Sequence, residues 1–155
     1  MKGNEKVIKR LNELLAGELT AIGQYVVHAE MCANWGYGKL HDVIKKRAIT
    51  EMKHAEQIIE RILFLEGTPD VSGMEKVLIG NDVEKQFNND RDAEEEANRN
   101  YNESIVLCYD EGDNGTLELL RSILTDEEKH LDWLETQLSL IKQIGNKNYL
   151  VEQVE

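Results

Sequence analysis

Two stretches of the sequence, Glu51-Met52-Lys53-His54 and Glu127-Glu128-Lys129-His130, place a glutamate three residues before a histidine. Residues three apart share one face of an α-helix, so each stretch would offer a carboxylate and an imidazole to a single point. One such match is common by chance in an acidic chain. Two matches, each near the middle of a long segment with helical spacing, favour a shared role.

The apolar residues around these stretches repeat with the period of a helix, and no segment alternates as a strand would. Breaks that contain glycine separate four long segments, and a short apolar tail follows the last break. Four long helices in one small domain predict an all-α fold, a four-helix bundle. We expect a single domain over residues 1–155, with helices at about 4–35, 38–66, 82–112, 115–144 and 147–155.

The lengths of the breaks predict the topology. Short breaks after the first and third segments make two antiparallel hairpins, whereas the break of about 14 residues between them can run the length of the bundle. We therefore expect one long crossover, and a short fifth helix that packs outside the four. Asn81-Asp82 and Asn114 are the expected N-caps of the third and fourth helices, and Gly67 and Gly145 the glycines that end the second and fourth.

The first and third segments each carry a glutamate on the apolar stripe, Glu18 and Glu94. The four helices then read Glu, Glu-x-x-His, Glu, Glu-x-x-His, which is the inventory that holds two metal ions in a bundle core. Without metal, four buried carboxylates would repel one another, and two divalent cations cancel their charge. Carboxylate with imidazole suits iron or manganese. We expect Glu51 and Glu127 to bridge the two ions, His54 and His130 to be terminal ligands, and Glu18 and Glu94 to close the outer positions.

Two tyrosines follow the outer glutamates at the same spacing. Tyr25 lies seven residues after Glu18, and Tyr101 lies seven after Glu94, about two turns along the same face. For Tyr25, a hydrogen bond to a ligand carboxylate and a core position with a satisfied hydroxyl are both open. For Tyr101 we favour the core position.

Met52 is turned about 100° from the ligand face, because it lies one residue past Glu51. It therefore faces out of the bundle. It is either an ordinary methionine in a subunit contact or a thioether axial ligand to haem.

The chain is strongly acidic, with 30 acidic and 18 basic residues and a formal net charge of −12. This balance argues against nucleic acid and anionic membranes as partners and fits a protein that attracts cations.

No apolar run approaches the length of a transmembrane helix, and the first residues enter an amphipathic pattern without a signal peptide. Cys32 and Cys108 have no metal or redox spacing, so we expect free thiols in the cytoplasm.

The chain resembles the bacterioferritin family over essentially its whole length. The resemblance is carried by Met1-Lys2-Gly3, Asn34-Trp35-Gly36, Glu51-Met52-Lys53-His54-Ala55, residues 60–67, Asp126-Glu127-Glu128-Lys129-His130 and Asp132-Trp133-Leu134-Glu135. It implies a ferritin-like bundle with a di-iron ferroxidase centre formed by Glu18, Glu51, His54, Glu94, Glu127 and His130. Fe(II) would be oxidised there by dioxygen or hydrogen peroxide.

The resemblance also implies an assembly, a homo-oligomeric shell of 24 subunits that stores ferric mineral. A b-type haem would be held between two subunits by Met52 from each, and would pass electrons inward from a donor protein such as a ferredoxin to mobilise the iron. Asn34, Glu66 and Asp132 match positions that line one class of pore, and Asn148 would lie near a four-fold channel.

One departure from the family pattern lies on the second helix. Some members carry a His and an Asp that bind an extra iron on the inner wall, and here those positions are Lys46 and Thr50. A cation at Lys46 disfavours iron, so we do not expect that route. His130, as a terminal ligand, would instead swing to release oxidised iron into the cavity.

Three other interpretations remain open at this point. A di-metal redox enzyme acting on a small molecule would share all six ligands but would need no shell. A haem-free ferritin differs from the main interpretation only at Met52. A purely structural bundle, with accidental buried acids, predicts no stoichiometric binding of metal.

Overall fold

Five helices account for the regular structure of the protein, which a computed structural model describes over residues 1–155. The long helices are α1 (Glu5–Asn34), α2 (Gly38–Phe64), α3 (Val83–Asp110) and α4 (Asn114–Ile144), and the short α5 spans Asn146–Val151. The all-α class predicted from the apolar spacing is confirmed. None of these helices is long and apolar enough to cross a membrane.

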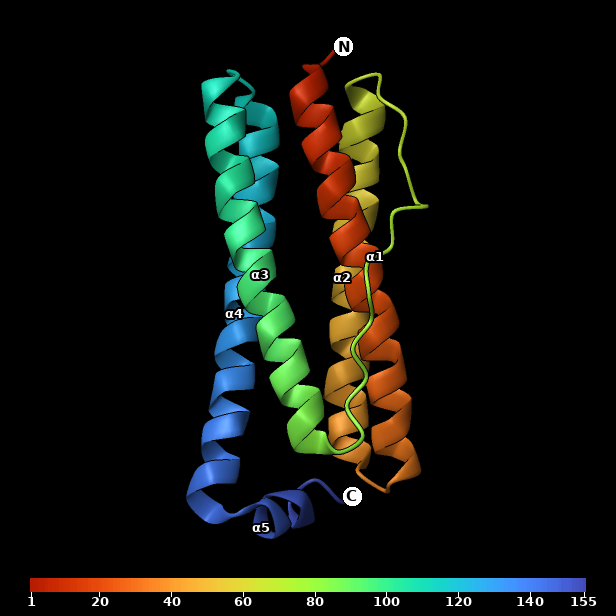
Figure 1. Ribbon diagram of the computed structural model, residues 1–155, viewed down its shortest axis with the longest axis vertical. Helices are drawn as coiled ribbons and strands as arrows, with labels where there is room; N and C mark the ends of the chain where they lie inside the picture. Colours follow the sequence, from red (N-terminus) through yellow and green to blue (C-terminus); the bar gives the residue numbers. More distant parts are fainter.

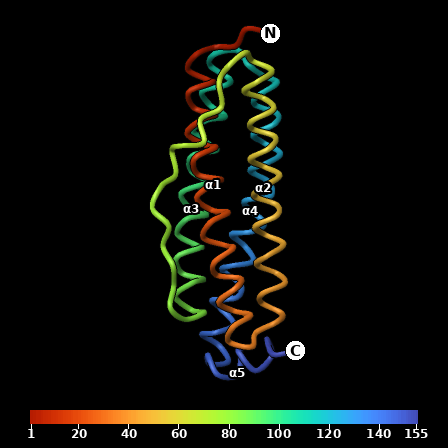
Figure 2. Tube along the Cα trace, turned by 90° about the vertical axis from the view of Figure 1, so that its right-hand side faces the viewer, coloured from red at the N-terminus to blue at the C-terminus, as the bar shows by residue number.

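The four long helices lie side by side along one axis, and α5 lies across the end at which α4 finishes (Figures 1 and 2). The tightly joined α1 and α2 form one antiparallel hairpin, and α3 and α4 form the other. Between the hairpins, residues 65–82 run along the outside of α1 from the end of α2 to the start of α3. The predicted bundle with one long crossover is therefore confirmed.

Side-chain caps fix where α3 and α4 begin. The Asp82 carboxylate accepts a hydrogen bond from the Lys85 N–H at 2.8 Å, so of the expected pair Asn81-Asp82 it is Asp82 that caps α3. For α4 the expected cap was wrong. The carboxylate of Asp113 accepts from the Thr116 N–H at 2.9 Å, which leaves Asn114 as the first helical residue.

The end of α2 also differs from expectation. Glu66, rather than Gly67, takes the left-handed backbone with φ of 63°, and the Gly67 N–H bonds to the Ile62 carbonyl at 2.9 Å. Gly67 is required for space instead, because a Cβ there would lie 2.7 Å from a side-chain carbon of Ile8. Gly145 does end α4 with φ of 85°.

The apolar core is divided into two clusters, one at each end of the bundle. Fully buried side chains of the first cluster are those of Val7, Leu11, Leu15, Ile58, Ile62 and Leu120. Those of the second cluster are Cys32, Leu40, Phe87, Leu134 and Tyr149. Burial of these side chains is the main force that holds the helices together. Between the clusters the helices turn polar residues inward, and the candidate site lies there.

Polar contacts fasten the crossover to the bundle. His28 on α1 is fully buried, with Nδ1 at 3.0 Å from Asp90 on α3 and with Nε2 accepting the Gly80 N–H at 3.1 Å. Since Nε2 accepts, the ring donates its Nδ1 proton to Asp90. Asp90 also accepts from Gln24 at 2.7 Å. A Cβ on Gly80 would lie 2.3 Å from the backbone nitrogen of Gln86, so only glycine fits there.

The short helix α5 closes one end of the bundle by burying Tyr149 in the second cluster. It ends at Val151, earlier than the expected 147–155. The reason is that the Gln153 carbonyl accepts a hydrogen bond from the Lys39 N–H at 3.2 Å, which turns the tail back to the start of α2.

Candidate metal centre

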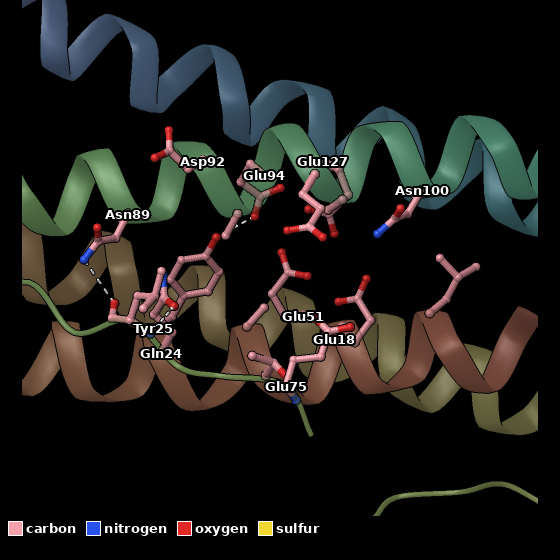
Figure 3. Close-up of a pocket in the computed structure, with 18 of the residues that line it drawn as sticks. Glu18, Gln24, Tyr25, Glu51, Glu75, Asn89, Asp92, Glu94, Asn100 and Glu127 are labelled. Carbon is pink, nitrogen blue, oxygen red and sulfur yellow. Dashed lines mark hydrogen bonds between the residues drawn. The ribbon is translucent and has the colours of Figure 1, made fainter. Parts of the chain in front are cut away.

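Four glutamates, one from each long helix, meet in the polar layer between the two apolar clusters. Figure 3 shows their carboxylates turned toward one another. A histidine follows one turn after two of these glutamates, and no member of the group is more than 4% exposed. The group consists of Glu18 on α1, Glu51 and His54 on α2, Glu94 on α3, and Glu127 and His130 on α4.

The donor atoms of these residues form two overlapping groups. Glu18, Glu51, His54 and Glu127 make one group, and Glu51, Glu94, Glu127 and His130 make the other. Within each group the donor atoms lie within 4.8 Å of one another. Glu51 and Glu127 belong to both groups. Two ions at these points would therefore share two carboxylates, and each would have one further glutamate and one histidine, so the structure brings all six expected ligands together.

Each of the four glutamates has one carboxylate oxygen that is buried without a hydrogen bond. These atoms are Glu18 Oε2, Glu51 Oε1, Glu94 Oε2 and Glu127 Oε2. A buried oxygen of a carboxylate is costly when it has no partner, and here four of them face one space. Two divalent cations would satisfy these oxygens and balance the charge of four carboxylates. The residues present therefore fit a di-iron centre.

Burial and mutual repulsion favour the protonated form of these carboxyl groups. Burial is the largest cause that raises the pKa of Glu18 and of Glu127. The pKa of Glu51 rises well above its usual range, first through burial and then through the neighbouring Glu18. Burial, followed by the neighbouring Glu127, raises the pKa of Glu94 to about 7. Cations must displace the protons, so metal binding releases protons and strengthens as pH rises.

The two histidines are held differently. The ring of His54 is bonded at both nitrogens, with Nδ1 at 3.0 Å from Glu127 and Nε2 at 2.9 Å from Asp126. His130 makes one such contact, from Nδ1 to Glu94 at 2.8 Å. Burial alone would lower the pKa of His54, but its carboxylate partners, Glu127 foremost, raise it. Burial prevails at His130 and lowers the pKa of its ring.

Asp126 is a residue of the site that the sequence reasoning missed. Its carboxylate fixes the orientation of the His54 ring, and its side chain is 45% exposed. Nothing in the spacing along α4 marks it out, because its role depends on how α4 packs against α2.

Two tyrosines tie the outer glutamates to the opposite helix. Tyr25 on α1 donates a hydrogen bond to Glu94 Oε1 on α3 at 2.5 Å, and Tyr101 on α3 donates to Glu18 Oε1 on α1. Burial and the nearby carboxylates raise the pKa of both hydroxyls well above the usual value, so both stay protonated. Tyr101 lies in the core, as expected, but also contacts the site. The seven-residue spacing that it shares with Tyr25 was the available signal.

A cavity of about 190 Å³ connects the cluster to the surface between α1 and α3 (Figure 3). Four exposed acids lie at its outer part, namely Glu13, Glu75, Asp92 and Glu96. One lysine, Lys76 of the crossover, lies among them. This acidic opening (Glu13, Glu75, Asp92 and Glu96) attracts cations toward the buried carboxylates.

The other residues singled out in the sequence lie on the surface. Met52 points out of the bundle and is 46% exposed, which agrees with its offset from Glu51. The four expected pore residues are exposed: Asn34, Glu66, Asp132 and Asn148. Asn34 and Glu66 lie at opposite ends of the bundle, so one chain alone does not join them into a pore.

A four-helix bundle with one long crossover, two Glu-x-x-His units and two further glutamates defines a ferritin-like di-metal protein. The sequence model of the ferritin-like domain family matches residues 8–144. A protein named bacterial ferritin from Synechocystis sp. is 43% identical over 155 residues, which cover 99% of each chain. A bacterioferritin from Mycolicibacterium paratuberculosis is 40% identical over 99% of this chain and 97% of its own length. Another from Brucella melitensis is 40% identical over 96% of this chain and 92% of its own. The chain belongs to the ferritin family.

Proposed function

We propose that the protein oxidises Fe(II) at the carboxylate cluster and stores the product as a ferric mineral. The observation that supports this best is the pair of overlapping donor groups that share Glu51 and Glu127, each glutamate with an unsatisfied oxygen. In a chain of the ferritin family, Fe(II) is the substrate that such a site fits.

The reaction removes one electron from each of two Fe(II) ions. Dioxygen takes up the two electrons with two protons to give hydrogen peroxide, or hydrogen peroxide takes them up with two protons to give two waters. Because both ions lie against the same two carboxylates, one oxidant collects both electrons at one place, which limits the release of radicals. The carboxyl protons that iron displaces from Glu51 and Glu94 are a nearby source for this chemistry.

We assign product release to His130. Its ring is bonded at one nitrogen, whereas His54 is bonded at both, so His130 is the ligand that can rotate away at the lower cost. A variant in which the His130 ring is immobilised should oxidise a first pair of ions and then mineralise slowly. Mineralisation at the normal rate would contradict this assignment.

We further infer that the chain forms a shell of 24 identical subunits, because a single bundle has no space for a mineral. In that shell Asn34, Glu66 and Asp132 would line one class of pore, and Asn148 would lie near the four-fold channel. A cytoplasmic location agrees with the two buried free thiols, Cys32 and Cys108. An electron-donor protein such as a ferredoxin would drive release of the stored iron.

Met52 fits an axial ligand to a b-type haem held between two subunits. Its thioether is half-exposed, and Ile49, one turn earlier on α2, is 42% exposed and offers an apolar contact to a porphyrin. The haem would supply a one-electron carrier between the surface and the mineral.

Graded aerobic addition of Fe(II) to the metal-free protein tests the main proposal. Iron that stays soluble with the protein far beyond about two ions per chain would support a storage shell. Saturation near two would instead indicate a di-metal redox enzyme that acts on a small molecule. Absence of stoichiometric binding would leave only a structural bundle.

Two variants test the assigned ligands. Glu18→Ala and His130→Ala should slow iron oxidation while the helical circular dichroism stays that of the wild type. Glu118→Ala, on the exposed surface of α4, is the matched control and should oxidise iron normally. Normal kinetics in both ligand variants would overturn the assigned site.

A further inference from the structure

A second surface groove, on the far side of the bundle from the acidic opening, reaches His130 of the metal centre. A groove of about 310 Å³ runs between α2 and α4, and His130 and Tyr25 line it. Tyr25 also lines the cavity between α1 and α3. The two hairpins place the α1–α3 face and the α2–α4 face on opposite sides, as Figure 2 shows. The buried carboxylates therefore lie between the acidic opening and this groove, which reaches the centre at His130.

This second groove is basic. Lys46, Arg47 and Thr50 on α2 and Lys129 on α4 line it, and we refer to it as the basic groove. Its one acid, Asp90, is buried and already bonded to two side chains of α1. The three cations are therefore not neutralised by the other groups that line the groove.

Arg47 indicates most clearly what the groove would bind. Its side chain is only 19% exposed, yet its guanidinium donates no hydrogen bond, and the acid nearest to it is Glu51, with Oε1 at 4.0 Å. That oxygen is one of the four unsatisfied carboxylate oxygens. A metal ion that takes up Glu51 leaves Arg47 without its neighbouring counter-charge. A largely buried guanidinium with free donors matches an oxyanion, to which it can donate two parallel hydrogen bonds.

The two sides of the bundle that flank the metal centre therefore carry opposite charge. The acidic opening attracts cations, while the basic groove attracts anions. Two Fe(II) ions balance the charge of four carboxylates, and their oxidation adds two positive charges beside Arg47. An anion in the groove would compensate that excess at the moment it arises.

We propose that the basic groove binds inorganic phosphate, or an oxyanion of the same shape and charge, next to the metal centre. Its role rests on the proposed ferroxidase function: the phosphate offers oxygen ligands to Fe(III) as the ion passes His130, so iron leaves the centre with its counter-ion. The binding itself needs only the groove and can be measured without iron.

Equilibrium dialysis of the complete, metal-free protein against radiolabelled inorganic phosphate tests the site directly. The wild-type protein should bind phosphate saturably, and Lys46→Gln/Lys129→Gln should raise the dissociation constant about tenfold or more. Lys45→Gln/Lys53→Gln is the matched control, since both lysines are exposed on α2, lie outside the groove and change the net charge equally. Thermal unfolding shows whether each variant is folded, and the single variant Lys129→Gln replaces the double groove variant if that variant is not.

Two successive additions of Fe(II), with and without phosphate, test the role. Phosphate should speed the second oxidation in the wild type and the control, and should lose that effect in the groove variant. The first oxidation should be equally fast in all three proteins.

The outcomes separate the two proposals. Equal phosphate affinity in the groove variant and the control, or no saturable binding by the wild type, would overturn the oxyanion site. Phosphate binding that depends on the groove lysines, in a protein that oxidises no iron, would support the site and overturn the ferroxidase. If phosphate affects the second oxidation equally in all three proteins, phosphate bound in the basic groove has no role in iron release.

Discussion

The hydroxyl of Tyr101 on α3 bonds to Oε1 of Glu18 on α1, and this leaves Oε2 of Glu18 as the oxygen without a partner. The same arrangement is repeated in reverse, because Tyr25 on α1 bonds to Oε1 of Glu94 and leaves its Oε2 unpaired. Each outer glutamate is therefore held by one oxygen and presents the other. The pair gives the centre an approximate twofold symmetry that matches two metal ions.

Removal of one of these hydroxyls should lower the affinity of the centre for metal ions without unfolding the bundle. Tyr101→Phe keeps the ring in the core but frees Glu18 to rotate, so we expect affinity for a redox-inert cation such as Zn²⁺ to fall about tenfold. Competition with a zinc-sensitive dye measures this. Tyr109→Phe, at a tyrosine that is 72% exposed, is the control. Equal affinity in Tyr101→Phe and wild-type protein would show that the hydrogen bond does not position Glu18.

Replacement of the outward methionine should separate haem binding from iron oxidation. Met52→Leu keeps the apolar surface but removes the sulfur, so the absorption band of bound haem should be lost while the first oxidation of Fe(II) stays unchanged. Met74→Leu, at an exposed methionine of the crossover, should keep the band. The role of Met52 is wrong if its leucine variant takes up haem with an unchanged spectrum.

The metal-free protein should be more stable in mild acid than at neutral pH. The pKa of Glu94 is about 7 in the folded chain against a usual 4.5, so the unfolded chain loses this proton first as pH rises. The contribution of the protonated Glu94 carboxyl to the free energy of unfolding is fully present below about pH 4.5. It is lost as pH rises through 7. Melting temperatures in the presence of a chelator should therefore fall across this window.

Glu94→Gln should flatten that pH dependence, because the amide is neutral throughout, whereas Glu118→Gln on the surface should keep it. A slope as steep in Glu94→Gln as in the wild type would place the effect elsewhere. Loading with Zn²⁺ should reverse the slope, since the bound ion requires ionised carboxylates.

Loss of the buried histidine of the crossover should destabilise the fold away from the metal centre. His28→Ala removes the ring that donates to Asp90 and accepts from Gly80, which leaves a buried carboxylate and a buried N–H short of partners. We expect the free energy of unfolding in urea to fall by about 3 kcal/mol. His41→Ala, near the start of α2 among exposed acids, should change it little. Equal losses in the two variants would mean that His28 does not fasten the crossover.

The sequence predicts the fold and the six candidate ligands because both depend on geometry within single helices. Apolar spacing and glycine breaks place the ends of the four long helices within two residues of those observed. Glu51 and His54 share a face whatever surrounds them, and so do Glu127 and His130. Two such units in the middle of antiparallel helices have to meet at the same level.

The features that were missed depend on contacts between helices or on local turns. Asp126 reaches His54 only because α4 packs against α2. The N-cap Asp113 and the left-handed residue Glu66 differ from the expected Asn114 and Gly67 by one residue each, since neighbouring positions compete for the same hydrogen bonds. The basic groove is likewise a property of α2 and α4 together, and single residues such as Lys129 give no sign of it.

The division of the apolar core into two clusters has a consequence for how the molecule moves. The middle of the bundle, where packing would normally hold the helices most firmly, is occupied by charges and protons. In the metal-free state we expect local opening to concentrate in this polar layer, between the two apolar clusters. Two ions held by side chains from all four long helices would link those helices to one another. Metal binding should therefore also stiffen the molecule, at the level of the polar layer between the two clusters.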